Sequence, residues 1–412
     1  MDPQMEIVIV RRPNGSLKAQ GLDMKDWKRS ILEFVMRVIG VLRYVVSTVV
    51  MLGAAPELFF LWSIWKGVSL VLPPWAYQNG DDICYSIYQR LVLFFFHHCT
   101  GLQVYFYGDT EEVFKKKETV LYVANHQSTV DWILTNMVAV EQGSLGHLRF
   151  VMKHELQMLP LYGYYFYQHG CIYVKRSHFQ PNKMVKSIEY LKDKRIPTWV
   201  VIFPEGTRFD PGDKERATKS RDVAIKAGLT PLEHHLTPRA KGAWLVTRHL
   251  HQRLDAVYDV TVAYAGTCNS IGSRTRAPHL VDFLLGKCKA VHIHVRRIPM
   301  SSVPVEESQF HQWIHSLFVE KDRLLKSFYS SDSATNAKVG PSNALLWGCG
   351  ENGNGPVFKQ NLGLRSTLPS LLLFSLFSIP LFFTRFGRSV YFNTLVGGTL
   401  GGYAWLAIAS VC

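Results

Sequence analysis

The sequence predicts an α/β domain that is flanked on both sides by apolar, membrane-associated segments. Between about residue 105 and residue 329, short β-rich runs alternate with segments of helical spacing, which is typical of an α/β fold. Long apolar stretches precede and follow this region, and 13% of all residues are aromatic, which favours a lipid interface. The β-rich runs are Thr119–Ala124, Cys171–Val174, Trp199–Phe203, Val257–Tyr264 and Val291–Val295.

Two segments of this region have the spacing of helices, Lys183–Lys194 and Val305–Phe328. In the second, apolar side chains recur at intervals of three and four residues, and Pro304 stands near the first turn. We therefore expect this helix to close over the core through Phe310, Trp313, Ile314, Leu317, Leu324, Leu325 and Phe328.

Shifts in composition divide the chain into five parts. Residues 1–30 form a polar N-terminal extension, 31–74 a membrane-associated helix or hairpin, 75–329 the α/β domain, 330–361 a flexible linker, and 362–412 the C-terminal membrane segments. The first part carries acidic groups and fits neither a secretory signal nor a transit peptide. Targeting information is therefore expected further along the chain.

The N-terminal apolar region permits two arrangements. The runs Tyr44–Leu52 and Leu58–Trp65 could cross a bilayer once, since a span needs ~20 apolar residues. Alternatively, two short helices could form a hairpin in one leaflet that breaks at Gly53–Pro56. The sequence leaves both open.

The C-terminal apolar region predicts a transmembrane hairpin. Leu368–Thr384 is apolar but short, Arg385 and Arg388 follow it, and Tyr391–Cys412 is uncharged and long enough to span. Glycines at 397, 398, 401 and 402 form two overlapping G-x-x-x-G registers, which would allow a neighbouring helix to approach closely.

The overall charge favours an anionic partner. Lysine and arginine outnumber aspartate and glutamate by 46 to 32, a formal charge of +14. The apolar ends indicate a bilayer rather than a nucleic acid as that partner. Seven scattered cysteines contain no C-x-x-C pair and no zinc spacing, so we expect a reduced chain without a metal site. No phosphate-binding P-loop or dinucleotide fingerprint is present.

The segment from Asn125 to Asp131 directly follows a predicted strand and combines a histidine with a carboxylate. If His126 lies in the strand-to-helix turn and Asp131 in the first helical turn, the two can meet, and Ser128 with Asp131 matches a helix-start signal. A neutral imidazole oriented by a carboxylate is a suitable base for removing the proton of a hydroxyl group. A capped helix with a surface histidine would give the same pattern.

Two further β-like runs end on arginines. The first ends in Lys175-Arg176, and the second in Glu205-Gly206-Thr207-Arg208. Guanidinium groups match phosphate oxygens, and Gly206 permits a close approach of the backbone to a ligand. Glu205 could orient the Arg208 guanidinium or accept a hydrogen bond from a substrate hydroxyl. Each run alone would more often be a strand that ends at a solvated basic turn.

Taken together, these motifs resemble those of the glycerolipid acyltransferase family, whose blocks are N-H-x-x-x-x-D, G-x-[IF]-x-x-x-R, F-P-E-G-T-R and a later block centred on proline. The first three occur here in this order. Longer stretches resemble the epsilon-type 1-acylglycerol-3-phosphate acyltransferases and, less closely, the lysocardiolipin acyltransferases. The fourth block departs from the pattern, because an arginine follows Pro238, and this leaves the identity of the acceptor open.

The resemblance implies a glycerolipid acyltransferase-like αβ domain and an acyl-CoA-dependent transfer to the sn-2 hydroxyl of lysophosphatidic acid. It assigns the catalytic pair to His126 and Asp131 and substrate binding to Lys175, Arg176, Glu205, Gly206, Thr207, Arg208 and Pro238. Acyl-CoA would be a co-substrate, and no metal or other cofactor is expected. Alternative acceptors are lysocardiolipin and lysophosphatidylinositol, and a non-catalytic lipid-binding protein is a third reading. The expected location is the endoplasmic reticulum membrane, as a multi-pass protein, with a mitochondrial membrane as the alternative.

Overall fold

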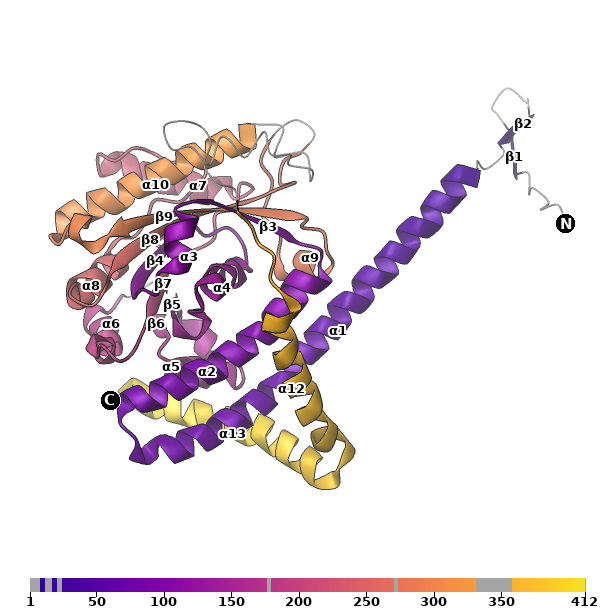
Figure 1. The fold of residues 1–412 in the computed structure, drawn as a ribbon. Helices are drawn as coiled ribbons and strands as arrows, with labels where there is room; N and C mark the ends of the chain where they lie inside the picture. Colours follow the sequence, from indigo (N-terminus) through magenta and orange to yellow (C-terminus); the bar gives the residue numbers. More distant parts are fainter. Residues whose placement is uncertain are drawn as a thin grey trace.

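A computed structural model describes residues 8–11, 17–20, 24–175, 179–269, 273–330 and 358–411. Its centre is an eight-stranded sheet with the order β10-β3-β9-β8-β4-β7-β5-β6 (Figure 1). The strands are β3 Gln103–Gly108, β4 Val120–Ala124, β5 Leu148–Lys153, β6 Ile172–Val174, β7 Trp199–Ile202, β8 Ala256–Tyr264, β9 Ala290–Pro299 and β10 Phe358–Lys359, and a separate pair is β1 Val8–Arg11 and β2 Leu17–Gln20. The α/β prediction is confirmed, and all five predicted strands are present.

The middle of the sheet is parallel. Strand β4 pairs in parallel with β7 and β8, and β5 pairs in parallel with β7 and β6. Strands β8 and β9 are antiparallel, as are β10 and β3. The carboxyl ends of β4 to β8 therefore lie along one edge of the sheet, here called the carboxyl edge.

Helices cover both faces of the sheet. In β4, Tyr122 contributes to a core with α2 and α4, whereas Leu121 and Val123 contribute to a second core with α6, α8 and α10, as the two-residue repeat of a strand requires. The helices of the domain are α2 Pro74–Leu93, α3 Thr110–Lys115, α4 Asp131–Gln142, α5 Tyr162–His169, α6 Pro181–Ile188, α7 Lys214–Lys226, α8 Lys241–Leu250, α9 Leu280–Leu284 and α10 Glu307–Ser330. Short 3₁₀ or π turns are η1 Ser69–Val71, η2 Phe94–Cys99, η3 Leu145–His147, η4 His154–Met158, η5 Glu189–Lys192 and η6 Met300–Ser302. Helix α10 buries Phe310, Ile314 and Leu317, so the expectation that it closes over the core is confirmed.

Helix α1, Met24–Val68, is continuous through Pro56, so a hairpin that breaks at Gly53–Pro56 is wrong. The chain turns instead at η1 and returns as α2. Proline has no N–H and cannot pair with the carbonyl four residues before it, which disturbs the helix one turn earlier. The flanking carbonyls there are satisfied from neighbouring helices: Tyr88 donates to Met51 O at 2.8 Å and Tyr391 donates to Gly53 O at 3.0 Å.

A buried ion pair and a buried hydrogen bond fix α2 to β5 and α5. Arg149 of β5 forms an ion pair with Asp82, and His169 Nδ1 lies 2.5 Å from Asp81 Oδ2. Asp81, Asp82 and His169 present ligand atoms within 4.8 Å of one another. Because the Arg149 guanidinium also lies 2.8 Å from His169 Nε2, a cation already occupies this cluster.

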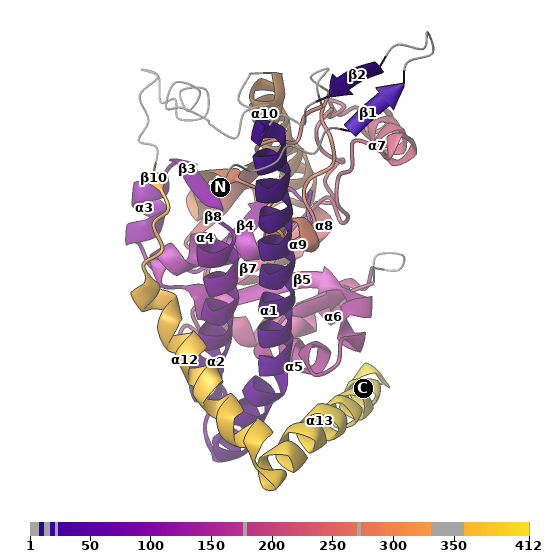
Figure 2. The same cartoon turned by 90° about the vertical axis from the view of Figure 1, so that its right-hand side faces the viewer.

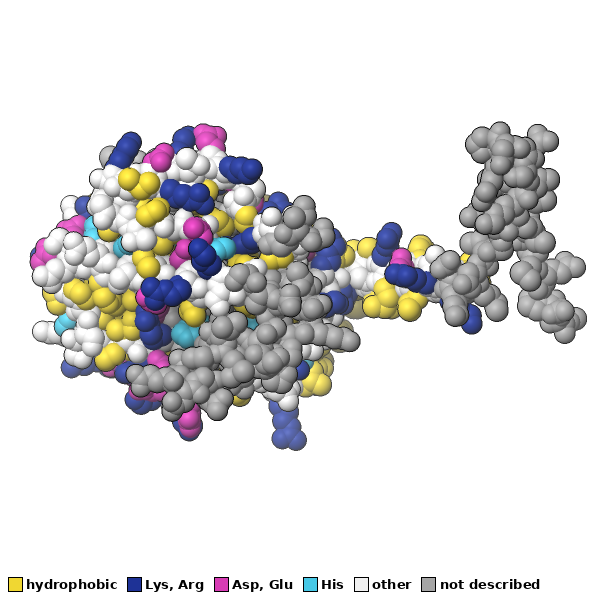
Figure 3. All heavy atoms as spheres, turned by 90° about the horizontal axis from the view of Figure 1, so that it is seen from above, with side chains coloured by type: hydrophobic (Ala, Val, Ile, Leu, Met, Phe, Trp, Pro, Cys, Tyr) yellow, Lys and Arg dark blue, Asp and Glu magenta, His cyan; other side chains and the backbone are white. Residues whose placement is uncertain are grey.

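The C-terminal part forms two helices, α12 Leu364–Phe383 and α13 Arg385–Val411, which meet in a V at Thr384 (Figure 2). One predicted glycine register is used, since Gly398 contacts Phe59 of α1 and Gly402 contacts Tyr164 of α5. Two helical segments of the described chain, Trp27–Val71 and Leu364–Phe383, are long and apolar enough to cross a membrane. The N-terminal part of α1 projects from the domain and carries hydrophobic and basic side chains (Figure 3).

Candidate active site

The candidate residues follow strands whose pairing brings them to one level of the carboxyl edge. Val201 of β7 pairs with Tyr122 of β4 and with Phe150 of β5, and Val151, the next residue of β5, pairs with Ile172 of β6. The next row across the sheet therefore contains Val123, Ile202, Val151 and Ile172, and His126, Glu205 and Lys175 each stand three residues beyond it. The parallel arrangement explains why motifs far apart in the sequence share an edge.

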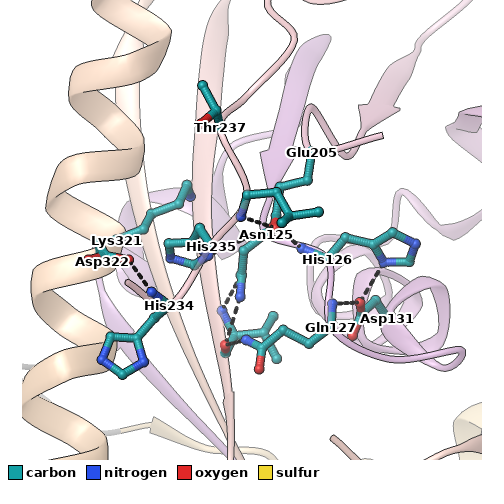
Figure 4. A network of polar contacts seen from close by, with 12 residues as sticks. Asn125, His126, Gln127, Asp131, Glu205, His234, His235, Thr237, Lys321 and Asp322 are labelled. Carbon is teal, nitrogen blue, oxygen red and sulfur yellow. Dashed lines mark hydrogen bonds and ion pairs between the residues drawn. The ribbon is translucent and has the colours of Figure 1, made fainter. Parts of the chain in front are cut away.

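His126 and Asp131 meet as predicted. His126 lies in the turn after β4, Asp131 is the first residue of α4, and His126 Nδ1 is 2.7 Å from Asp131 Oδ2 (Figure 4). The same oxygen accepts the backbone amides of Gln127 at 2.7 Å and Ser128 at 2.9 Å. The imidazole is 21% exposed and the carboxylate 2%, so Asp131 holds Nδ1 from the protein side and leaves Nε2 for a substrate. The predicted contact is confirmed, and its catalytic role stays a prediction.

The turn that carries His126 is tied to strand β8. Asn125 Oδ1 accepts from Val262 N at 2.7 Å, and Asn125 Nδ2 donates to Val262 O at 3.0 Å. Gln127 Nε2 donates to the same Val262 carbonyl at 2.7 Å. These contacts leave His126 little freedom to move relative to the sheet, which favours a preorganised base.

Glu205 is buried behind His126. Its Oε1 accepts the backbone amide of His126 at 2.6 Å, and its Oε2 accepts that of Leu236 at 2.9 Å (Figure 4). Burial raises the pKa of Glu205 to about 8, against the opposing effect of these two amides. His235 Nδ1 lies 3.8 Å from Oε1, and burial holds the pKa of His235 well below its usual range. Neither side chain reaches water.

This geometry gives Glu205 a different contact from the one that the sequence suggested. Its carboxylate joins the His126 turn to the segment before Pro238, and no ion pair with Arg208 occurs within the described residues. These two bonds to backbone amides therefore account for the buried Glu205 carboxylate without a bound substrate. Binding of a substrate hydroxyl by Glu205 stays an untested prediction.

The residues after Glu205 form a half-buried wall of the site. Gly206 has a φ of +69°, a conformation that favours glycine, and its α-carbon faces the Arg239 side chain. Thr207, Arg208 and Pro238 are half-buried beside it. The backbone of Arg239 is hydrogen-bonded to Pro204 O at 2.8 Å, so the Pro238 block is fixed against the Glu205 block.

Arg208 and Arg276 both lie near His279. The pKa of His279 is lowered by its partial burial and by the nearby guanidinium groups of Arg276 and Arg208. Lys175 is exposed after β6, three strands from β4, which corresponds to ~14 Å at the usual strand spacing. Arg176 lies outside the described residues, so its placement stays a prediction.

Comparisons with known proteins show the family of the chain. A family model described as acyltransferase matches residues 107–265, and one described as acyltransferase C-terminus matches residues 282–345. The 1-acyl-sn-glycerol-3-phosphate acyltransferase epsilon of Mus musculus is 39% identical over 89% of this chain and 96% of its own length. This chain belongs to the 1-acyl-sn-glycerol-3-phosphate acyltransferase family.

A relative from a plant has the same family name. The probable 1-acyl-sn-glycerol-3-phosphate acyltransferase 5 of Arabidopsis thaliana is 31% identical over 73% of this chain and 77% of its own. The solved structure of the 1-acyl-sn-glycerophosphate acyltransferase of Thermotoga maritima covers 70% of this chain and 98% of its own, with 14% identity and a TM-score of 0.42.

In this acyltransferase, two residues of the site have no signal in the sequence motifs. Tyr264, the last residue of β8, donates its hydroxyl to Asp131 Oδ1. Arg274 contacts Gln127 through its side chain and bonds to His234 O at 3.1 Å, so it joins the His126 turn to the segment before Pro238. Because β8 also contains Asp259 and Thr261, a polar group at its end does not single out Tyr264 in the sequence.

Proposed function

We propose that this chain transfers an acyl group from acyl-CoA to the sn-2 hydroxyl of lysophosphatidic acid and so forms phosphatidic acid. The observation that carries the proposal is the His126–Asp131 pair with Nε2 open to the outside of the carboxyl edge. The relatives named as 1-acyl-sn-glycerol-3-phosphate acyltransferases support the choice of acceptor.

The reaction would proceed by direct transfer. His126 Nε2 takes the proton of the acceptor hydroxyl while its oxygen attacks the thioester carbonyl, and Asp131 stabilises the imidazolium that forms. The carbon–sulfur bond then breaks, and the CoA sulfur takes the proton from the imidazolium. A thioester has a good leaving group, so the proposed reaction uses no metal or redox cofactor.

The acceptor phosphate would bind at Arg208, with Arg176, Lys175 and the Gly206–Thr207 backbone as further candidates. A charge-assisted contact to phosphate is worth ~1.5–3 kcal/mol, so its loss weakens binding roughly tenfold to a hundredfold. Arg208→Lys should raise the KM for lysophosphatidic acid and leave that for acyl-CoA unchanged, because lysine loses the bidentate geometry. A raised KM for acyl-CoA alone would move the acceptor phosphate to Pro238 and Arg239.

The bilayer would be a partner of α1 and α12. Their exposed apolar side chains, among them Phe34, Leu42, Val49 and Leu376, support this. We propose an endoplasmic reticulum membrane, with a mitochondrial membrane as the alternative that immunolocalisation would distinguish.

The decisive experiment is an acyl-transfer assay with purified protein, labelled oleoyl-CoA and a panel of lysophospholipids, with His126→Ala as the matched control. Lysophosphatidic acid should give the highest kcat/KM. A preference for monolysocardiolipin or lysophosphatidylinositol would replace the acceptor and keep the mechanism. No transfer by the wild-type protein above the His126→Ala background, with any acceptor, would leave a lipid-binding protein as the better conclusion.

A further inference from the structure

A small cavity lies at the carboxyl edge beside the catalytic turn. Its volume is about 220 Å³, and its walls come from residues 265–267 after β8, residues 287–289 before β9, and Thr275, Arg276, Pro278 and Asp282 between them. We call it the α9 cavity, because Asp282 belongs to that helix. Neither the family motifs nor the catalytic pair includes any of these residues.

The α9 cavity shares a wall with the catalytic turn. Ser128 donates its hydroxyl to the carbonyl of Pro278, and Leu280 N donates to Thr129 Oγ1 at 2.9 Å. Ser128 is two residues from His126, a distance of at most ~7 Å along the backbone. On the opposite side, Ala265 directly follows Tyr264, which holds Asp131. A ligand group in the cavity would therefore lie beside the catalytic turn without displacing a substrate at His126.

The charge of the α9 cavity suits an anion. Arg276, Lys287 and Lys289 stand against one carboxylate, that of Asp282, which leaves an excess of two positive charges. Lys287 Nζ is 3.0 Å from Asp282 Oδ1 and neutralises it. Within the described chain, neither Arg276 nor Lys289 has a carboxylate at ion-pair distance, and both are exposed. The Arg276 guanidinium and the Lys289 ammonium group, next to the hydroxyl of Thr275, are donors of the kind that phosphate oxygens require.

The size of the cavity limits the ligand to part of a molecule. Pockets that enclose a whole small ligand usually measure ~300–1,000 Å³, and the α9 cavity is smaller. One or two phosphate groups fit this description. The acceptor phosphate has its own candidate at Arg208, whereas acyl-CoA carries phosphates at the far end of its pantetheine arm, away from the thioester that must reach His126.

We propose that the α9 cavity binds phosphate groups of the nucleotide end of acyl-CoA through Arg276 and Lys289, an assignment that rests on the proposed acyl-CoA-dependent function. The same phosphate chemistry could come from an anionic phospholipid head group, because Leu280 and Val281 on α9 are exposed apolar side chains beside the cavity. The experiment has to separate these two sources.

The test compares two acyl donors in mixed micelles at saturating lysophosphatidic acid. Oleoyl-CoA carries the phosphates, and S-oleoyl-pantetheine carries the same thioester without any phosphate. The variants are Arg276→Gln, Lys289→Gln and the double variant, with Arg276→Lys to retain the charge. Lys192→Gln and Arg323→Gln are matched controls, since both side chains are exposed cations outside the cavity.

Each single substitution should raise the KM for oleoyl-CoA roughly threefold to tenfold, and the double variant should raise it further, because exposed charge-assisted contacts are partly screened. The KM for S-oleoyl-pantetheine, the KM for lysophosphatidic acid and kcat should stay at the wild-type values. Arg276→Lys should recover part of the loss, and the two control variants should behave as wild type.

Three results would overturn the proposal. Equal losses with both donors would mean a general effect on the site, and a raised KM for lysophosphatidic acid would make this an acceptor site. Variants that alter only the response to added phosphatidylserine would show a head-group site. Calorimetric binding of CoA itself, with no acceptor present, tests the cavity even if the acceptor differs from lysophosphatidic acid: weaker binding to the double variant supports the cavity, and unchanged binding refutes it.

Discussion

The substitution Asp131→Asn removes the negative charge of the carboxylate but can keep its hydrogen bonds. Asp131 Oδ2 accepts from His126 and from two backbone amides, and Oδ1 accepts from the Tyr264 hydroxyl. An asparagine that places its oxygen at Oδ2 keeps the first three donors, and its NH₂ group can donate to Tyr264 once the phenol turns. The Asp131→Asn variant should therefore fold normally and hold the imidazole in place without a negative charge.

The expected loss follows from the charge alone. The transition state contains an imidazolium whose charge centre would lie ~4 Å from the carboxylate, and a pair at that distance interacts by ~4 kcal/mol at an effective dielectric constant of 20. Because the Asp131 side chain is only 2% exposed, water screens this interaction little. A loss of that size corresponds to a fall in kcat of ~10³-fold.

The assay measures kcat at saturating substrates together with the melting temperature. Asp131→Asn should keep the wild-type melting temperature, whereas the control Asp131→Ala should lower it, because it leaves the buried amides of Gln127 and Ser128 unpaired at ~1–3 kcal/mol each. A kcat for Asp131→Asn within tenfold of wild type would refute the electrostatic role and leave Asp131 as a structural cap.

His126→Ala should abolish transfer with an unchanged melting temperature, since it removes a partly exposed base; residual activity within a few-fold of wild type, measured with labelled oleoyl-CoA, would reject His126. Burial raises the pKa of Glu205 from 4.5 to about 8, so the folded protein binds the carboxyl proton of Glu205 more tightly than the unfolded chain does. The contribution of Glu205 to the free energy of unfolding should therefore decline as the pH rises from 4.5 to 8. Glu205→Gln cannot titrate and should flatten that decline in melting curves from pH 5 to 8.5; parallel slopes would contradict the shift. Tags after Asn361 and after Thr384 should differ in protease protection if α12 crosses the bilayer, and equal accessibility would favour a shallow re-entrant helix.

The local part of the site could be predicted from the sequence, and the non-local part could not. The His126–Asp131 contact depends on a strand, a turn and a helix start within seven residues, all of which have sequence signals. Tyr264 reaches the same carboxylate across 133 residues. The partners of Glu205 are backbone amides, which no residue pattern reveals.

In the fold, too, the features that the sequence failed to predict depend on residues distant in the chain. Strand β5 was not predicted because Arg149 interrupts its apolar run, and that arginine is buried through its ion pair with Asp82, which lies 67 residues earlier in the chain. Pro56 suggested a break in α1, but the helix is continuous there, and tyrosines of two other helices bond to Met51 O and Gly53 O one turn earlier. In both cases residues distant in the sequence contact a local feature that normally ends an element.

The contact between α1 and the domain has a consequence for how deep the active site would lie in a membrane. Arg43 donates to Leu284 O at 2.7 Å and to Cys99 O at 3.1 Å, and its guanidinium packs so closely on Gly286 that a β-carbon there would come within 2.2 Å of it. This fixed point joins α9 to the residue directly before the apolar run that begins at Tyr44. One residue inserted between them would shift the run by ~1.5 Å and rotate it by ~100°. If α1 lies in a bilayer as proposed, the helix register at Arg43 would set the height of the active site relative to that bilayer.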